Sequence, residues 1–265
     1  MTTPTSPPKA PLEILQRTER LRVSDGTVTP ILPPAGLTQR TLLLVWPQLG
    51  DFDSLEYAGW MVREHDRLQD LNLDVRAVGI GNRQSGQVFC QFTGFPADKL
   101  WVDPTGALHQ ELLLYRGLTV AWPGLSTAQR AWVNLMLMCA GIGSPGTLAE
   151  VFRGYWGDRH APQLIPDDEP FITNLLPPLN GTFFAIAGGK GFQRPFELAT
   201  VRLKNMVEVL RKWNHYVPDA SHMTQRGGTF LFDQDGQILY EHRDRGILGF
   251  ASNMANPLAF LDQLD

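Results

Sequence analysis

Apolar and polar positions in the first part of the chain predict a parallel strand–helix–strand unit. Residues 42–46 form a short apolar run, and residues 75–80 form a second one. Between them, apolar side chains at three- and four-residue intervals predict a helix from residue 52 to about 71. A short helix over 85–93, ended by Gly94, should follow the second run. This order is typical of a parallel β-sheet covered by helices.

The C-terminal part predicts the antiparallel half of such a sheet. Two strand-like runs, 229–233 and 237–241, are joined through Asp235-Gly236, which is a strong hairpin signal. A final helix is expected from about residue 257 to 264. Together with the first unit, these elements predict one α/β domain.

Residues from about 118 to 195 do not fit this minimal plan and predict a helical insertion. Ser126 to Gln129 form a capping box, and the helix that they open, over about 127–140, is apolar on nearly every face. Burial explains such a helix most simply, and docking against a partner or a membrane surface is the alternative. A second helix is expected to start at Ser144-Pro145, because proline suits the first helical turn.

The later part of the insertion is more mixed. We expect a loop over 158–178, which is rich in proline and acidic residues, and a strand over 181–187. After the insertion, an amphipathic helix should run from 195 to about 217. Its inward face is expected to carry Leu203, Met206, Val207, Leu210 and Trp213, and its basic side Arg194, Arg202, Lys204, Arg211 and Lys212.

Composition limits the classes of function. The net charge of −4 argues against nucleic acid as the main partner. No stretch reaches the roughly 20 apolar residues that a membrane span needs. Residues 1–11 are rich in proline, threonine and serine, so we expect a disordered arm and no signal peptide. Residues 12–265 should then form a single domain that contains the insertion.

The turn after the first strand has the residues of a helix start but no thiol. Asp51, Phe52, Asp53 and Ser54 follow the break at Pro47 to Gly50. A thioredoxin-type fold carries Cys-x-x-Cys at this place, because the helix N-terminus stabilises a thiolate. Carboxylates are equally suited to a helix N-terminus. We therefore expect Asp51 and Asp53 to cap the helix, and neither acid–base chemistry nor a metal site is favoured.

Several segments carry a family resemblance. Residues 50–58 are similar to the pattern Gly-Cys-Pro-x-Cys-x-Glu-x-Ala, with Asp51 and Ser54 in the two cysteine positions. Residues 89–96 and 102–104 are similar to Phe-Cys-x-x-Thr-Gly-Phe-Pro and Val-Asp-Pro, and residues 225–244 to a closing Gln-x-Gly-Gly … Leu-x-Glu-His-Arg segment. These motifs resemble the peroxiredoxin-like (AhpC/TSA) branch of the thioredoxin superfamily, particularly its cyanobacterial and plastid-type members. The resemblance implies an α/β fold with a thioredoxin-like central mixed sheet, helices on both faces and a helical insertion.

The chain has two cysteines, Cys90 and Cys139, which are expected to be reduced, separate and largely buried. Cys90 lies within a predicted helix, where a buried, inert side chain is the favoured interpretation and a relocated nucleophile is the alternative. Cys139 lies in the apolar helix, so we expect a structural role for it.

The leading hypothesis is a degenerate peroxiredoxin-like protein without redox cysteines, in which Asp51 and Ser54 mark the vestigial active-site positions. Such a protein would act as a non-catalytic binding or assembly factor. One alternative is a thiol-dependent peroxidase or oxidoreductase that uses Cys90. The other is a small-ligand binder with a pocket between the sheet and the insertion. No cofactor and no metal ion are expected.

A partner surface is expected on the insertion, because aromatic, methionine and arginine side chains are enriched at interfaces. Its candidate residues are Trp132, Met136, Phe152, Trp156, Arg202, Lys204, Arg211 and Lys212. The family resemblance suggests a photosynthetic source and a protein partner, with a photosynthetic complex as one candidate. It is compatible with a cytoplasmic or thylakoid-peripheral location (plastid stroma in a eukaryote) and with peripheral membrane association.

Overall fold

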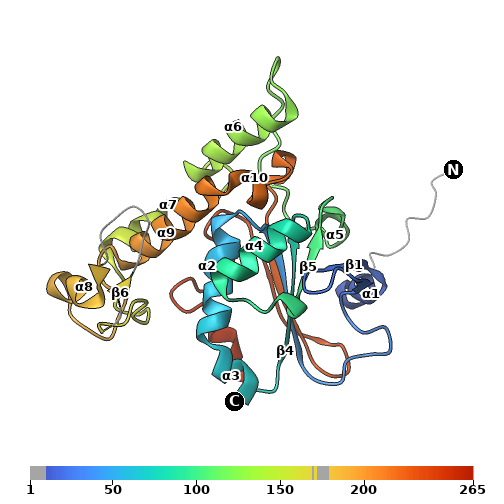
Figure 1. The fold of residues 1–265 in the computed structure, drawn as a ribbon, viewed down its shortest axis with the longest axis horizontal. Helices are drawn as coiled ribbons and strands as arrows, with labels where there is room; N and C mark the ends of the chain where they lie inside the picture. The colour runs from blue at the N-terminus through green and yellow to red at the C-terminus, as the bar shows by residue number, and fades with distance from the viewer. Residues whose placement is uncertain (1–9, 169, 172–178, 265) are drawn as a thin grey trace.

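A computed structural model of the chain describes residues 10–168, 170–171 and 179–264. Its centre is a mixed sheet with the strand order β2-β1-β5-β4-β3-β8-β9 (Figure 1). β3 pairs in parallel with β4, and β4 with β5, whereas β8 is antiparallel to β3 and β1 is antiparallel to β5. The predicted mixed α/β sheet is therefore confirmed. The strands are β1 (Glu19–Arg22), β2 (Val28–Pro30), β3 (Thr41–Gln48), β4 (Asp74–Ile80), β5 (Leu100–Asp103), β8 (Gly228–Phe232) and β9 (Ile238–Arg243).

Helices cover both faces of this sheet, as predicted. Every residue of β3 is buried, and its side chains alternate between two apolar layers. Leu42, Leu44 and Trp46 pack in the layer that holds residues of α2 (Phe52–Arg63) and α4 (Arg83–Thr93). Leu43 and Val45 pack in the opposite layer, with residues of α1 (Pro11–Arg17) and α5 (Ala107–Glu111).

The predicted elements of the sheet unit form with small differences. The helix expected over 52–71 is interrupted at Glu64, whose ψ of 19° is not helical, so that α2 is followed by a separate α3 (His65–Asp70). α4 ends at Gly94 in a left-handed conformation, as its sequence predicts. The expected C-terminal helix is a shorter 3₁₀-helix, η3 (Ala259–Gln263). Two further 3₁₀ turns, η1 (Ala97–Lys99) and η2 (Ala220–His222), lie in connections.

The insertion extends from one end of the sheet domain, with α8 at its far end (Figure 1). The capping box at Ser126 opens α6 as predicted. The next helix starts at Thr147 and not at Ser144-Pro145, because Gly146 has a left-handed backbone conformation (φ 85°) that a helix does not continue through. The elements of the insertion are α6 (Thr127–Cys139), α7 (Thr147–Trp156), β6 (Pro170–Phe171), β7 (Leu179–Asn180) and α8 (Gly181–Gly188). The helices α9 (Glu197–Arg211) and α10 (Trp213–Tyr216) follow it.

The strand expected over 181–187 is wrong. It is the helix α8, because a short apolar run without periodicity fits either element and only its surroundings decide. The inward face expected for α9 is confirmed only in part: Val207 is buried as expected, whereas Leu210 is 55% exposed. Leu198, Asn205 and Val209 are also buried. α9 contacts both α2 and α7, so two neighbours determine which side is covered.

The remaining loop and terminal predictions are tested only in part. β6 lies within the loop expected over 158–178, of which residues 169 and 172–178 fall outside the described residues. Pro11, at the end of the expected N-terminal arm, begins α1, and residues 1–9 also fall outside the described part. Across the described residues, no helix combines the length and the apolar character that crossing a bilayer requires.

Candidate functional site

The turn between β3 and α2 is built from polar groups that hold one another. Asp51 is the N-cap of α2, and its carboxylate accepts a hydrogen bond from the backbone N–H of Asp53 at 3.0 Å. The Ser54 hydroxyl donates to the carbonyl oxygen of Gln48 at 3.0 Å. The cap expected at Asp51 is therefore present. Asp53 does not cap the helix, because its fully buried side chain points to other groups.

Arg226 supplies the positive charge for this turn. Its fully buried guanidinium lies 2.5 Å from the Asp51 carboxylate and 3.3 Å from the Asp53 carboxylate. It also donates to the carbonyl oxygens of Met223 and Thr224. Arg226 was not predicted as a site residue. Two signals in the sequence pointed to it: its position between Gln225 and the paired glycines that open β8, and the two carboxylates at the start of α2, which need a cation if they are buried.

Burial shifts the pKa values of this cluster. It raises the pKa of Asp53 well above its ordinary range, and the neighbouring Asp51 carboxylate adds to the effect. Burial likewise raises the pKa of Asp244 to about 7. Burial by itself would lower the pKa of Arg226, but the Asp51 and Asp53 carboxylates raise it, so the guanidinium stays charged. The cluster thus joins three carboxyl groups to one permanent cation.

A largely apolar pocket of about 330 Å³ lies above the turn. Its floor is the turn itself, and α6, α9 and α10 close it from the side of the insertion. This is the space between sheet and insertion that the sequence analysis proposed for a small ligand. The lining residues are Gln48, Gly50, Asp51, Phe52, Trp132, Leu135, Met136, Cys139, Met206, Val209, Leu210, Trp213, Val217, Met223 and Ile247.

Neither cysteine occupies the start of α2. Cys90 is buried in the core as expected, and burial raises the pKa of its thiol to about 12. Cys139 is only partly buried and lines the pocket, where burial also raises the pKa of its thiol. Both cysteines are free. The structure thus places Cys139, and not Cys90, beside the turn.

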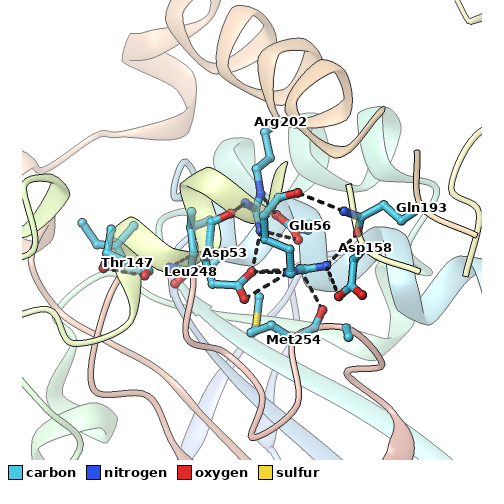
Figure 2. Close-up of polar contacts among 12 residues, drawn as sticks. Asp53, Glu56, Thr147, Asp158, Gln193, Arg202, Leu248 and Met254 are labelled. Carbon is cyan, nitrogen blue, oxygen red and sulfur yellow. Dashed lines mark hydrogen bonds and ion pairs between the residues drawn. The ribbon is translucent and has the colours of Figure 1, made fainter. Parts of the chain in front are cut away.

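A buried polar network connects α2 to the insertion (Figure 2). Arg202 of α9 binds the Glu56 carboxylate of α2 at 2.7 and 3.0 Å, and it donates to the carbonyl oxygen of Glu150 on α7. Arg153 of α7 pairs with Glu150 and reaches the side chain of Gln193. Close by, the backbone N–H of Leu248 donates to Asp53 at 2.8 Å. These contacts fix the insertion relative to the turn.

The aromatic residues of the candidate partner surface lie at the surface in two stacked pairs. Trp132 stacks on Trp213, and Phe152 stacks on Trp156, with ring centroids 5.1 Å apart in each pair. Trp156 is 73% exposed and Met136 is 51% exposed. The expectation that the apolar helix over 127–140 is buried is therefore wrong. Within α6 only Ala131, Asn134 and Met138 are buried.

The basic residues of that surface do not form a common face. Arg202 is largely buried in its ion pair with Glu56, and Lys204 lies over the rings of Phe92 and Phe171. Lys212 pairs with Glu208, and Arg211 is exposed. Arg194, expected on the same basic side, is fully buried between Asp167 and Glu197. Most of these basic side chains therefore form ion pairs with acidic residues of the same chain.

The strand order of the sheet, with a capped helix directly after the central strand β3, defines a thioredoxin-like protein. The chain belongs to the AhpC/TSA antioxidant enzyme family, whose family model matches residues 60–195 and 180–246. These segments together span more than half of the chain and begin after the turn at 51–54. No curated protein matches the sequence.

Proposed function

We propose that this chain is a non-catalytic member of the AhpC/TSA family that binds a small ligand above its former thiol site. The observation that carries the proposal is the turn at the start of α2. By the motif resemblance, Asp51 and Ser54 correspond to the two cysteine positions of the family. Each is held by a partner, Asp51 by Arg226 and Ser54 by the Gln48 carbonyl oxygen. The place of a reactive thiolate is thus taken by a permanent ion pair.

The chemistry of the two cysteines supports a non-catalytic protein. Attack on a peroxide requires a thiolate, and the fraction of thiolate falls as the thiol pKa rises above the ambient pH. Burial raises the pKa of both Cys90 and Cys139. Cys90, the nucleophile of the alternative peroxidase hypothesis, lies in the core and does not line the pocket above the turn.

The pocket supports the binding part of the proposal. Its volume of about 330 Å³ is at the lower end of the range for small-molecule sites. Apolar side chains make up most of its wall, and a few polar groups converge at its floor. This arrangement is typical of ligand pockets.

Peroxide consumption with a thiol-regenerating system tests the non-catalytic part. We expect the wild-type chain to match the Cys90→Ser, Cys139→Ser double variant. The Asp51→Cys, Ser54→Cys variant should gain a rate about tenfold or more above it, because the helix N-terminus and Arg226 would stabilise a thiolate there. A wild-type rate that disappears in Cys90→Ser alone would overturn the proposal and establish the peroxidase alternative.

A protein partner is a second candidate, favoured by the exposed stack of Phe152 and Trp156. The motif resemblance is the basis for three finer proposals. The partner would be a photosynthetic complex, the source would be cyanobacterial or plastid, and the location would be peripheral to a membrane. If this stack binds a protein, the Phe152→Ser, Trp156→Ser variant should lose the proteins that co-purify with the native chain. Unchanged co-purification would remove this stack as the binding surface.

A further inference from the structure

We infer that the pocket above the turn takes a small amphiphile with a hydrocarbon body and a hydrogen-bond-donating head, an alcohol or an amine, and discriminates against a carboxylate head. The inference rests on the proposed ligand-binding function and adds the class of ligand. Three features carry it: the apolar walls, an unpaired acceptor at the floor, and the charge around the turn.

The walls suit a flexible hydrocarbon. Leu135 and Met136 of α6 face Val209 and Leu210 of α9 across the pocket, and the stacked rings of Trp132 and Trp213 lie beside them. Three methionines, Met136, Met206 and Met223, are among the lining side chains. Because unbranched thioether side chains adapt to irregular shapes, this wall can accommodate chains or small rings.

The floor carries a hydrogen-bond acceptor without a partner. The Gln48 side chain is 2% exposed, and its amide N–H donates to the carbonyl oxygen of Asp219 at 2.7 Å. This bond fixes the orientation of the amide, and the Gln48 Oε1 atom has no hydrogen-bond partner among the described residues. A buried acceptor without a partner costs free energy, which a donor on the ligand would recover.

The charge at the floor is negative on the side of the pocket. Asp51 lines the pocket, and none of the lining side chains is a lysine, an arginine or a histidine. Arg226, the nearest cation to the turn, is already paired with Asp51 and Asp53. A ligand carboxylate would therefore lose its hydration and meet another carboxylate without gaining a cation. A hydroxyl or an ammonium group can instead donate to the remaining lone pairs of Asp51, which lines the pocket. A small shift of the Gln48 side chain would bring its buried Oε1 atom within reach of the same donor.

Three probes of equal chain length test the inference on the full-length protein: octylamine, 1-octanol and octanoate. Cys139 lines the pocket, so its alkylation by a maleimide reports whether the pocket is occupied, and the fluorescence of the Trp132–Trp213 pair gives a second readout. We expect octylamine and 1-octanol to slow the alkylation of Cys139 at concentrations about tenfold or more below those that octanoate requires.

Two variants control the experiment. Met206→Trp fills the pocket and should abolish protection by every probe. Ile186→Ala removes an exposed apolar side chain of α8 that does not line the pocket, and it should leave protection unchanged.

The possible outcomes distinguish a failure of ligand binding from a failure of the inferred head group. If none of the probes protects Cys139, the proposed ligand-binding function fails, and the inference fails with it. If octanoate protects as well as octylamine and 1-octanol, ligand binding stands and the inferred head group is wrong. Protection that persists in Met206→Trp would show that the probes bind elsewhere, which contradicts both.

Discussion

Two buried side chains near the turn have pKa values that burial moves in opposite directions. Burial raises the pKa of Asp244 to about 7 and lowers the pKa of His109 to about 4. Asp244 accepts a hydrogen bond from the backbone N–H of Gly227, beside the Arg226 guanidinium and within 3.7 Å of His242. The imidazole of His109 contacts the carbonyl oxygen of Trp46 at 2.8 Å. Both groups are therefore uncharged over much of the acidic range, although one is an acid and the other a base.

The pH dependence of stability should separate them. The folded state binds the Asp244 proton more tightly than the unfolded state does. This contribution is complete below the unfolded pKa of about 4 and is lost as the pH rises to about 7. Asp244→Asn should therefore remove a decline of about 1.4 kcal/mol per pH unit in this window. His109→Asn should remove a gain of similar slope between pH about 4 and about 6.5, since the unfolded imidazole binds the proton.

Urea unfolding of the parent and of both variants across this pH range measures the two slopes. Each comparison with the parent reports the substituted residue together with the groups that it interacts with; for Asp244→Asn these include the Asp53 carboxyl, whose pKa the Asp244 charge helps to raise. Parallel stability curves for Asp244→Asn and the parent would show that Asp244 titrates normally in the folded state.

At the scale of elements, Arg202 determines how α9 docks. This one side chain contacts Glu56 on α2 and Glu150 on α7, and both ion pairs are largely buried. Replacing one member of a buried pair leaves the other charge without compensation, at a cost of about 3–5 kcal/mol. The contact therefore matters more for the position of the insertion than an exposed ion pair would.

Arg202→Met should loosen α7 and α9 while the central strands remain protected. Native-state hydrogen exchange should show faster exchange in these two helices and little change in β3 and β4. Lys212→Met, at the C-cap of α9, is the matched control. Its partly exposed pair with Glu208 contributes about 0.5 kcal/mol or less, so exchange should not change measurably. Equal effects of the two substitutions would contradict the docking role.

At the scale of the whole molecule, the reactivity of the two cysteines reports the opening of two different parts of the structure. Cys90 lies in the apolar layer between the sheet and α4, whereas Cys139 lies on α6 at the edge of the pocket. Exposing Cys90 requires opening of the sheet domain. Cys139 is already partly exposed in the pocket, and a movement of α6 away from the turn would expose it fully.

Thiol labelling at increasing urea concentration should therefore proceed in two stages. We expect Cys139 to react first, at urea concentrations below the main unfolding transition, and Cys90 to react only within that transition. Mass spectrometry of peptides from the labelled protein measures both rates. Simultaneous labelling of the two thiols would show that insertion and sheet open as one unit.

The elements that the sequence determined by itself are those that depend on local interactions. The continuous apolar run of β3, the Asp235-Gly236 hairpin and the Ser126 capping box each act over a few residues, and each formed as predicted. Local patterns also indicated the helix start at Asp51, because capping involves only neighbouring backbone groups. From these, the mixed sheet and the position of the candidate turn followed.

Only the tertiary structure decided how distant charges pair and which faces are covered. Arg226 is 175 positions from Asp51, and Arg202 is 146 positions from Glu56, so no local pattern connects either pair. The apolar run of α8 has no periodicity, and the buried side of α9 depends on two neighbouring helices. The pocket above the turn exists because α6, α9 and α10 close over Asp51. Such features depend on burial and on the position of remote partners, which the fold supplies and the local sequence does not.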